Sequence, residues 1–174
     1  METRALTALD RRIAVIGTGT WQLGLDQGEV APETAAAALE AAVDAGVTLI
    51  DTADVYGDGR SERFVGRFLA AHPGAGLTVA TKMGRRAAQT PESYTREGFL
   101  AWNDRSRANL GVETIDLVQL HCPPGPVIEA PRTWQWLDEM VEAGRIRAYG
   151  VSAETCEQAL EAIGHSAKDR KSVV

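Results

Sequence analysis

The sequence is poor in the residues that support several common classes of small protein. It has two cysteines, Cys122 and Cys156, with no Cys-X-X-Cys pair and no Cys/His set at zinc-ligand spacing. Two isolated cysteines do not make a disulfide framework, and without ligand spacing the sequence predicts no metal site. No run approaches the ~20 apolar residues of a transmembrane helix, and the charges spread through the first twelve positions break up any secretion signal. A net charge of −6 gives no attraction for nucleic acid. We therefore expect a cytoplasmic protein without nucleic-acid or membrane partners.

What the chain does contain is a regular alternation of short apolar runs and segments with helical periodicity. Strands that alternate with amphipathic helices predict a parallel sheet with right-handed crossovers. Hydrophobic content of 44% and charged content of 24% are ordinary for one globular domain. The runs are residues 13–16, 47–50, 77–81, 115–120 and 146–151, and helices are expected from Pro32 to before Gly46, around 64–69, at 96–110, from Pro131 to before Gly144, and at 154–163.

Two fold classes fit this alternation, an open doubly wound sheet and part of a (β/α)8 barrel. The glycines at 17 and 19 hint at a dinucleotide fingerprint, but the third glycine is displaced to Gly24 and the helix begins only near Pro32. We therefore expect an α/β fold of the (β/α)8 TIM barrel type that is incomplete, with about five βα units present and strands six to eight missing. Residues 1–163 would form the partial barrel and residues 164–174 a polar, divergent tail.

Four polar side chains follow three successive predicted strands. Asp51 and Tyr56 come after the second strand, Lys82 after the third and His121 after the fourth. The carboxyl ends of parallel strands meet at one rim, where barrel enzymes carry their active sites. Taken singly, each has a structural explanation, such as a helix cap for Asp51 or a half-buried aromatic for Tyr56. Their shared placement favours one assembled site.

The four residue types make a tuned proton donor. A phenol is a weak acid in water. A lysine ammonium stabilises the phenolate, and a carboxylate keeps that ammonium charged and in place. A histidine can hydrogen-bond a substrate oxygen and orient it. Reduction of a carbonyl group needs such an acid, together with a cofactor that supplies hydride.

Five segments make the chain similar to the aldo-keto reductases, and their order and spacing agree with that family. They are GTGTW at 17–21, DTADVYG at 51–57, VATK at 79–82, DLVQLH at 116–121 and GRIRAYGVS at 144–152. The resemblance covers residues 10 to 163. It implies an oxidoreductase that reduces small aldehydes or ketones with hydride from NADPH.

The resemblance also implies a role for each matching residue. Tyr56 would be the general acid, helped by Lys82 and Asp51, and His121 would orient the carbonyl oxygen. The implied cofactor contacts are Gly19, Thr20, Asp51 and Ser152, and the implied substrate contacts are Trp21, Tyr56, His121 and Cys122.

In the family, later βα units stack a ring on the nicotinamide and bind the adenosine 2′-phosphate. The sequence after Ile163 is polar and basic and shows no sixth apolar strand, so we expect a truncated chain. Two alternatives to an active reductase stay open: a non-catalytic, barrel-type regulatory or binding subunit, and an inactive fragment of a reductase. The first and last strands would be sheet edges, through which we expect self-association.

Strand alternation makes a further prediction about side-chain direction. If Lys82 and His121 point to the barrel interior, so do Ala80 and Gln119 two residues earlier in each strand. Trp134, Trp136 and Cys156 lie on the apolar faces of predicted helices, so we expect all three to be packing residues.

Overall fold

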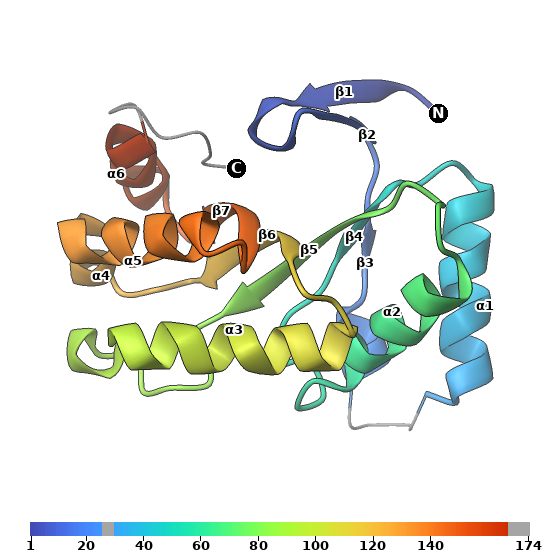
Figure 1. Ribbon diagram of the computed structural model, residues 1–174, viewed down its shortest axis with the longest axis horizontal. Helices are drawn as coiled ribbons and strands as arrows, with labels where there is room; N and C mark the ends of the chain where they lie inside the picture. The colour runs from blue at the N-terminus through green and yellow to red at the C-terminus, as the bar shows by residue number, and fades with distance from the viewer. Residues whose placement is uncertain (26–29, 167–174) are drawn as a thin grey trace.

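The computed structural model describes residues 1–25 and 30–166. Its centre is a parallel sheet of five strands whose order in space is β3-β4-β5-β6-β7, the same as their order in the chain (Figure 1). A doubly wound sheet reverses its strand order at a switch point, whereas a barrel sheet does not. The doubly wound alternative is therefore wrong, and the partial barrel is confirmed. The strands are β3 (Thr18–Gly19), β4 (Leu49–Asp51), β5 (Thr78–Met83), β6 (Ile115–His121) and β7 (Ile146–Ser152).

Helices connect the strands and lie around the outer side of the sheet (Figure 1). Their boundaries follow local signals: Pro32 opens α1, and the Thr95 hydroxyl caps α3 by accepting a hydrogen bond from the Gly98 N–H at 3.1 Å. Gly111 ends α3 in the left-handed conformation. The helices are α1 (Pro32–Asp44), α2 (Arg60–Ala71), α3 (Arg96–Leu110), α4 (Gly125–Glu129), α5 (Pro131–Glu142) and α6 (Cys156–Ser166), with 3-10 turns η2 (Trp21–Gly24) and η3 (Pro91–Ser93).

The sheet separates a large outer core from a small inner one. The outer core lies between sheet and helices and includes Phe99 and Trp134, both fully buried. The inner core contains Ala80, Leu117 and Ala148, against which Leu9 packs. Leu9 belongs to the turn η1 (Thr7–Leu9) of an antiparallel hairpin, β1 (Thr3–Leu6) and β2 (Arg11–Ala14). The hairpin therefore closes the interior on the side away from the helices.

The strand register confirms the predicted side-chain directions. Ala80 is the partner of Leu117 and Lys82 is the partner of Gln119, so these positions share the inner face that carries the small core. His121, two residues beyond Gln119, pairs with Ser152. Lys82, Gln119 and His121 therefore all face the barrel interior.

The sequence-based prediction of the first strand is wrong. Residues 13 and 14 belong to the hairpin, Val15 and Ile16 are 42% and 60% exposed, and the first strand of the parallel sheet is β3. An apolar run in a hairpin that pairs on one side looks the same in sequence as one buried in a sheet. The short helix α4 was also not predicted.

The buried face of the last helix differs from the prediction as well. Cys156 is exposed at the start of α6 rather than in the core. Ala162 is buried instead, and the His165 ring stacks on Trp134 at 5.2 Å between centroids. Trp134 and Trp136 do pack in the outer core, as predicted. The helix α6 extends through Ser166, and the rest of the predicted tail lies outside the described residues.

Within the described residues, no helix has the length and apolar character that crossing a membrane requires. The cytoplasmic location stays a prediction.

We expect the 174-residue chain to self-associate when it is produced alone. Strands β3 and β7 each pair with one strand among the described residues, and unpaired strand edges template further pairing. Ile16 lies beside β3 and is 60% exposed, so Ile16→Lys should place a charge at that edge and weaken association. Sedimentation velocity over a wide concentration range measures the effect.

The matched control is Ala70→Lys, which adds the same charge to an exposed position of α2. A chain that sediments as a monomer at every concentration would contradict the prediction.

Candidate active site

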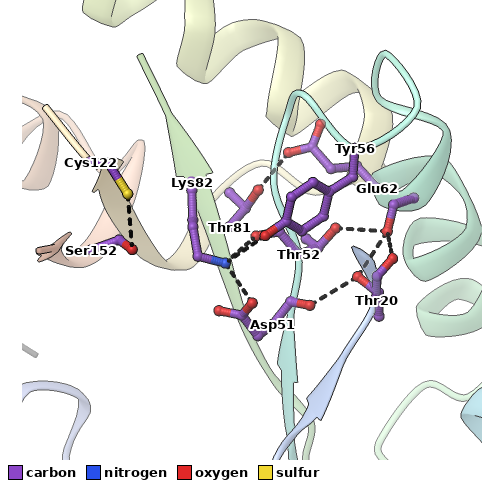
Figure 2. A network of polar contacts seen from close by, with 10 residues as sticks. Thr20, Asp51, Thr52, Tyr56, Glu62, Thr81, Lys82, Cys122 and Ser152 are labelled. Carbon is purple, nitrogen blue, oxygen red and sulfur yellow. Dashed lines mark hydrogen bonds and ion pairs between the residues drawn. The ribbon is translucent and has the colours of Figure 1, made fainter. Parts of the chain in front are cut away.

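Lys82 is the centre of the polar network on the barrel rim. Strand β5 carries its side chain into the interior, where the Nζ donates hydrogen bonds to Asp51 Oδ1 at 2.5 Å and to the Thr52 carbonyl at 3.1 Å. A third, longer contact of 3.5 Å reaches the Tyr56 hydroxyl. Figure 2 shows the ammonium between the carboxylate and the phenol. The Lys82 side chain is only 9% exposed, so its charge is compensated almost entirely by the protein.

The loop that carries Tyr56 leaves β4 immediately after Asp51. The Tyr56 N–H donates to the Ala53 carbonyl at 3.2 Å, and the Tyr56 carbonyl accepts from the Ser61 N–H at 3.2 Å, which joins the loop to α2. Gly24 packs directly on this loop. A Cβ at Gly24 would lie 2.5 Å from the backbone carbon of Tyr56, so only glycine fits there.

Three buried hydroxyl groups hold the strand ends together behind this loop. The Ser61 hydroxyl lies 2.8 Å from the Thr20 hydroxyl and 3.0 Å from the Thr52 hydroxyl. The Thr20 hydroxyl donates to the Asp51 carbonyl at 2.9 Å. Thr20 therefore fixes β3 to β4, and all of its polar atoms already have partners in the chain.

His121 packs against the Tyr56 ring. The two rings meet edge to face, with 6.0 Å between centroids and 87° between planes. Burial, together with the positive charges of Lys82 and Arg85, lowers the pKa of His121 from 6.5 to about 4. The imidazole is therefore neutral at pH 7 and keeps one N–H to donate. Its Nδ1 is buried and has no hydrogen-bond partner among the described residues.

Tyr56 and His121 open into one cavity of about 530 Å³. Trp21 lies on its wall with 55% of its surface exposed, and Arg85 also lines it. The cavity thus combines a proton donor, a neutral imidazole, an aromatic surface and a cation. Within the described residues, no group of three or more His, Cys, Asp or Glu side chains is arranged to hold a metal ion.

The remaining predicted site residues lie at the same strand ends. Ser152 ends β7 beside His121, and its hydroxyl is 3.8 Å from the Cys122 sulfur. Figure 2 places this pair across Lys82 from Tyr56. Gly19 ends β3, and a Cβ there would meet no atom within 4 Å, which leaves an open surface. All the sequence-predicted residues therefore gather on one rim, although only Trp21, Tyr56 and His121 among them line the cavity itself.

Sequence reasoning missed a pair of buried acids beneath the Tyr56 loop. Asp54 is completely buried, and neither carboxyl oxygen has a hydrogen-bond partner among the described residues. Glu62, also buried, accepts from the Thr81 hydroxyl at 2.6 Å and from the Asn109 amide at 2.8 Å. Asp54 stands two residues before Tyr56 in the same motif, but nothing local in the sequence distinguishes a buried aspartate from a loop aspartate.

Burial, together with the nearby Glu62 carboxylate, raises the pKa of Asp54 from 3.8 to about 7. Between pH 3.8 and about 7, the folded protein holds a proton on Asp54 that the unfolded chain has lost. The contribution of Asp54 to stability therefore falls as pH rises through this range. His121, whose pKa is lowered to about 4, contributes the opposite slope over nearly the same range. The two groups therefore oppose each other.

We predict that Asp54→Asn makes the free energy of unfolding rise more steeply with pH between about 4 and 7, since it removes the falling contribution and leaves that of His121. The slope should change by up to about 1.4 kcal/mol per pH unit. Urea unfolding at a series of pH values measures it, and Asp44→Asn, at an exposed position at the end of α1, is the control. Parallel curves for wild type and Asp54→Asn would refute the assignment.

Comparison with known proteins finds relatives of this chain in one family. The family model described as "Aldo/keto reductase family" matches residues 15–174. Aldo-keto reductase YhdN of Bacillus subtilis is 34% identical over 147 residues, which cover 82% of this chain and 44% of that protein. The 6-dehydroglucose reductase of Novosphingobium aromaticivorans is 35% identical over 162 residues, which cover 88% of this chain and 51% of that protein.

A solved structure shows the same fold. The aldo-keto reductase from Klebsiella pneumoniae in complex with NADPH aligns with a TM-score of 0.76 and 25% identity, over 94% of this chain and 54% of that one. The chain thus spans about half the length of the proteins that it matches. The family model, the two relatives and the shared fold together establish that this chain belongs to the aldo/keto reductase family.

Proposed function

We propose that the protein reduces aldehyde or ketone carbonyls with hydride from NADPH, with Tyr56 as the proton donor. The observation that carries the proposal is the position of the Lys82 ammonium, 2.5 Å from an Asp51 oxygen and 3.5 Å from the Tyr56 oxygen. A phenol held beside a fixed cation on the rim of a cavity is arranged to give up a proton. Such an acid has a use where negative charge develops on a substrate oxygen.

The chain's own part in the reaction is proton transfer and orientation. As the carbonyl oxygen gains negative charge, the Tyr56 hydroxyl gives it a proton, and the Lys82 ammonium stabilises the phenolate that remains. Asp51 keeps the ammonium in place by accepting its shortest hydrogen bond. In the reverse direction, alcohol oxidation, the phenolate takes the proton back.

His121 supplies orientation rather than protons. Because its pKa is about 4, the imidazole is neutral near pH 7 and does not compete with Tyr56 as the acid. A neutral imidazole can donate one N–H to the carbonyl oxygen and thereby direct that oxygen towards Tyr56, whose ring lies 6.0 Å away. Trp21 offers an aromatic surface to the rest of the substrate, and Cys122 directly follows His121 past the end of β6.

The rim fits the nicotinamide end of the cofactor. Gly19 leaves an open surface at the end of β3, and the half-buried Ser152 hydroxyl is available at the end of β7 to hydrogen-bond a carboxamide. Thr20, which is bonded to Asp51 and Ser61, would support this surface, and Asp51 would contact the cofactor from the same strand end. When bound, NADPH supplies the hydride that no side chain can donate. The Klebsiella relative is described in complex with NADPH, which supports the choice of cofactor.

We predict that Tyr56→Phe abolishes measurable NADPH oxidation with an aromatic aldehyde, since loss of a general acid costs about 10²–10⁴ in rate. Steady-state absorbance at the NADPH band measures it. Tyr149→Phe removes a hydroxyl that donates to Asp138 on the helix side of the sheet, and it should retain activity. Equal turnover by wild type and Tyr56→Phe would exclude Tyr56 as the acid.

The second candidate is a binding subunit without turnover, which retains the same rim. It is distinguished by a fluorescence titration with NADPH alongside the kinetic assay. Saturable NADPH binding without aldehyde reduction would favour the binding subunit, and absence of both would favour an inactive fragment.

A further inference from the structure

Among the described residues that line the cavity, Arg85 is the one with a permanent charge, and the proposed chemistry leaves it without a role. It follows Lys82 by three positions, past the end of β5, and it lines the cavity together with Tyr56, His121 and Trp21. Its side chain is exposed, and no carboxylate among the described residues forms an ion pair with it.

The neighbouring arginines behave differently. Arg86 and Arg105 both bind the Asp58 carboxylate, the latter at 2.7 Å. Asp58 thus neutralises part of the charge on the outside of the loop, while Arg85 keeps its charge on the cavity side. Arg85 and Arg86 are adjacent in sequence but differ in whether a carboxylate already holds them.

The charges around the cavity leave Arg85 uncompensated. Lys82 is paired with Asp51, and His121 is neutral at pH 7 because burial, with Lys82 and Arg85, lowers its pKa to about 4. None of the described residues that line the cavity is an aspartate or glutamate. In a protein of net charge −6, Arg85 therefore places a positive charge on the wall of this cavity.

Building on the proposed carbonyl reduction, we propose that Arg85 is a specificity-determining residue that selects aldehydes or ketones carrying a carboxylate. The carbonyl oxygen would lie at Tyr56 and His121, the carbon body against Trp21, and the carboxylate at the Arg85 guanidinium. The planar fork of a guanidinium matches a carboxylate with two parallel hydrogen bonds. One arginine supplies one unit charge, which suits a carboxylate better than a phosphate dianion.

The test compares 4-formylbenzoate with its near-isosteric neutral amide, 4-formylbenzamide. The ratio of their kcat/KM values should fall about tenfold in Arg85→Gln, because a charge-assisted bond to the carboxylate is lost. Comparing ratios between proteins cancels the intrinsic reactivity of the two aldehydes. Arg85→Lys should retain part of the preference, and added salt should weaken it.

The matched control is Arg86→Gln, which removes the same charge one residue away from an arginine already bound to Asp58. It should leave the ratio unchanged. If both aldehydes are reduced and the ratio of their kcat/KM values is the same in wild type and Arg85→Gln, the inference is overturned while carbonyl reduction stands. An equal fall of that ratio in Arg85→Gln and Arg86→Gln would overturn it as well.

A binding measurement separates this inference from the proposed function. Titration with benzoate and with benzamide, followed through the His121 imidazole signals by NMR, reports on the cavity without turnover. Benzoate should bind more tightly than benzamide to wild type but not to Arg85→Gln. If the protein binds benzoate selectively but reduces neither aldehyde, the carboxylate site at Arg85 is supported and the proposed carbonyl reduction is rejected. If wild type binds benzoate and benzamide equally, the carboxylate site is rejected.

Discussion

The Lys82 ammonium is the group on which the arrangement of the rim depends. A buried charge costs several kcal/mol unless partners compensate it, and at 9% exposure Lys82 has little help from solvent. Its partners come from the end of β4 and from the loop that follows: the Asp51 carboxylate, the Thr52 carbonyl and the Tyr56 hydroxyl. Satisfying one cation therefore places the carboxylate and the phenol together, and the acid chemistry follows from that placement.

The surrounding structure holds those partners at some cost. Ser61 and Thr20 tie the strand ends together through buried hydroxyl groups, and Gly24 allows a close approach that a side chain would block. Asp54 is buried beneath the loop without a hydrogen-bond partner among the described residues, an arrangement that destabilises its ionised form. Buried polar groups of this kind cluster at functional sites, where geometry is maintained against local stability.

Much of the site could be predicted because the relevant signals are local. Apolar runs followed by polar residues identified the strand ends that carry Asp51, Lys82 and His121, and helical periodicity placed a helix at 96–110, where α3 lies. The first strand, the exposure of Cys156 and the burial of Asp54 could not be predicted in this way. Each depends on which face a neighbouring element covers, and that contact joins residues far apart in the chain.

The most direct test is a double-mutant cycle on the free energy of unfolding with Asp51→Asn and Lys82→Met. If the ammonium and the carboxylate compensate each other, each single variant leaves its partner uncompensated, and the double variant costs less than the sum of the two. We predict a coupling of at least about 1 kcal/mol, within the range for residues in contact. Additivity within about 0.3 kcal/mol, as expected for independent sites, would contradict the account.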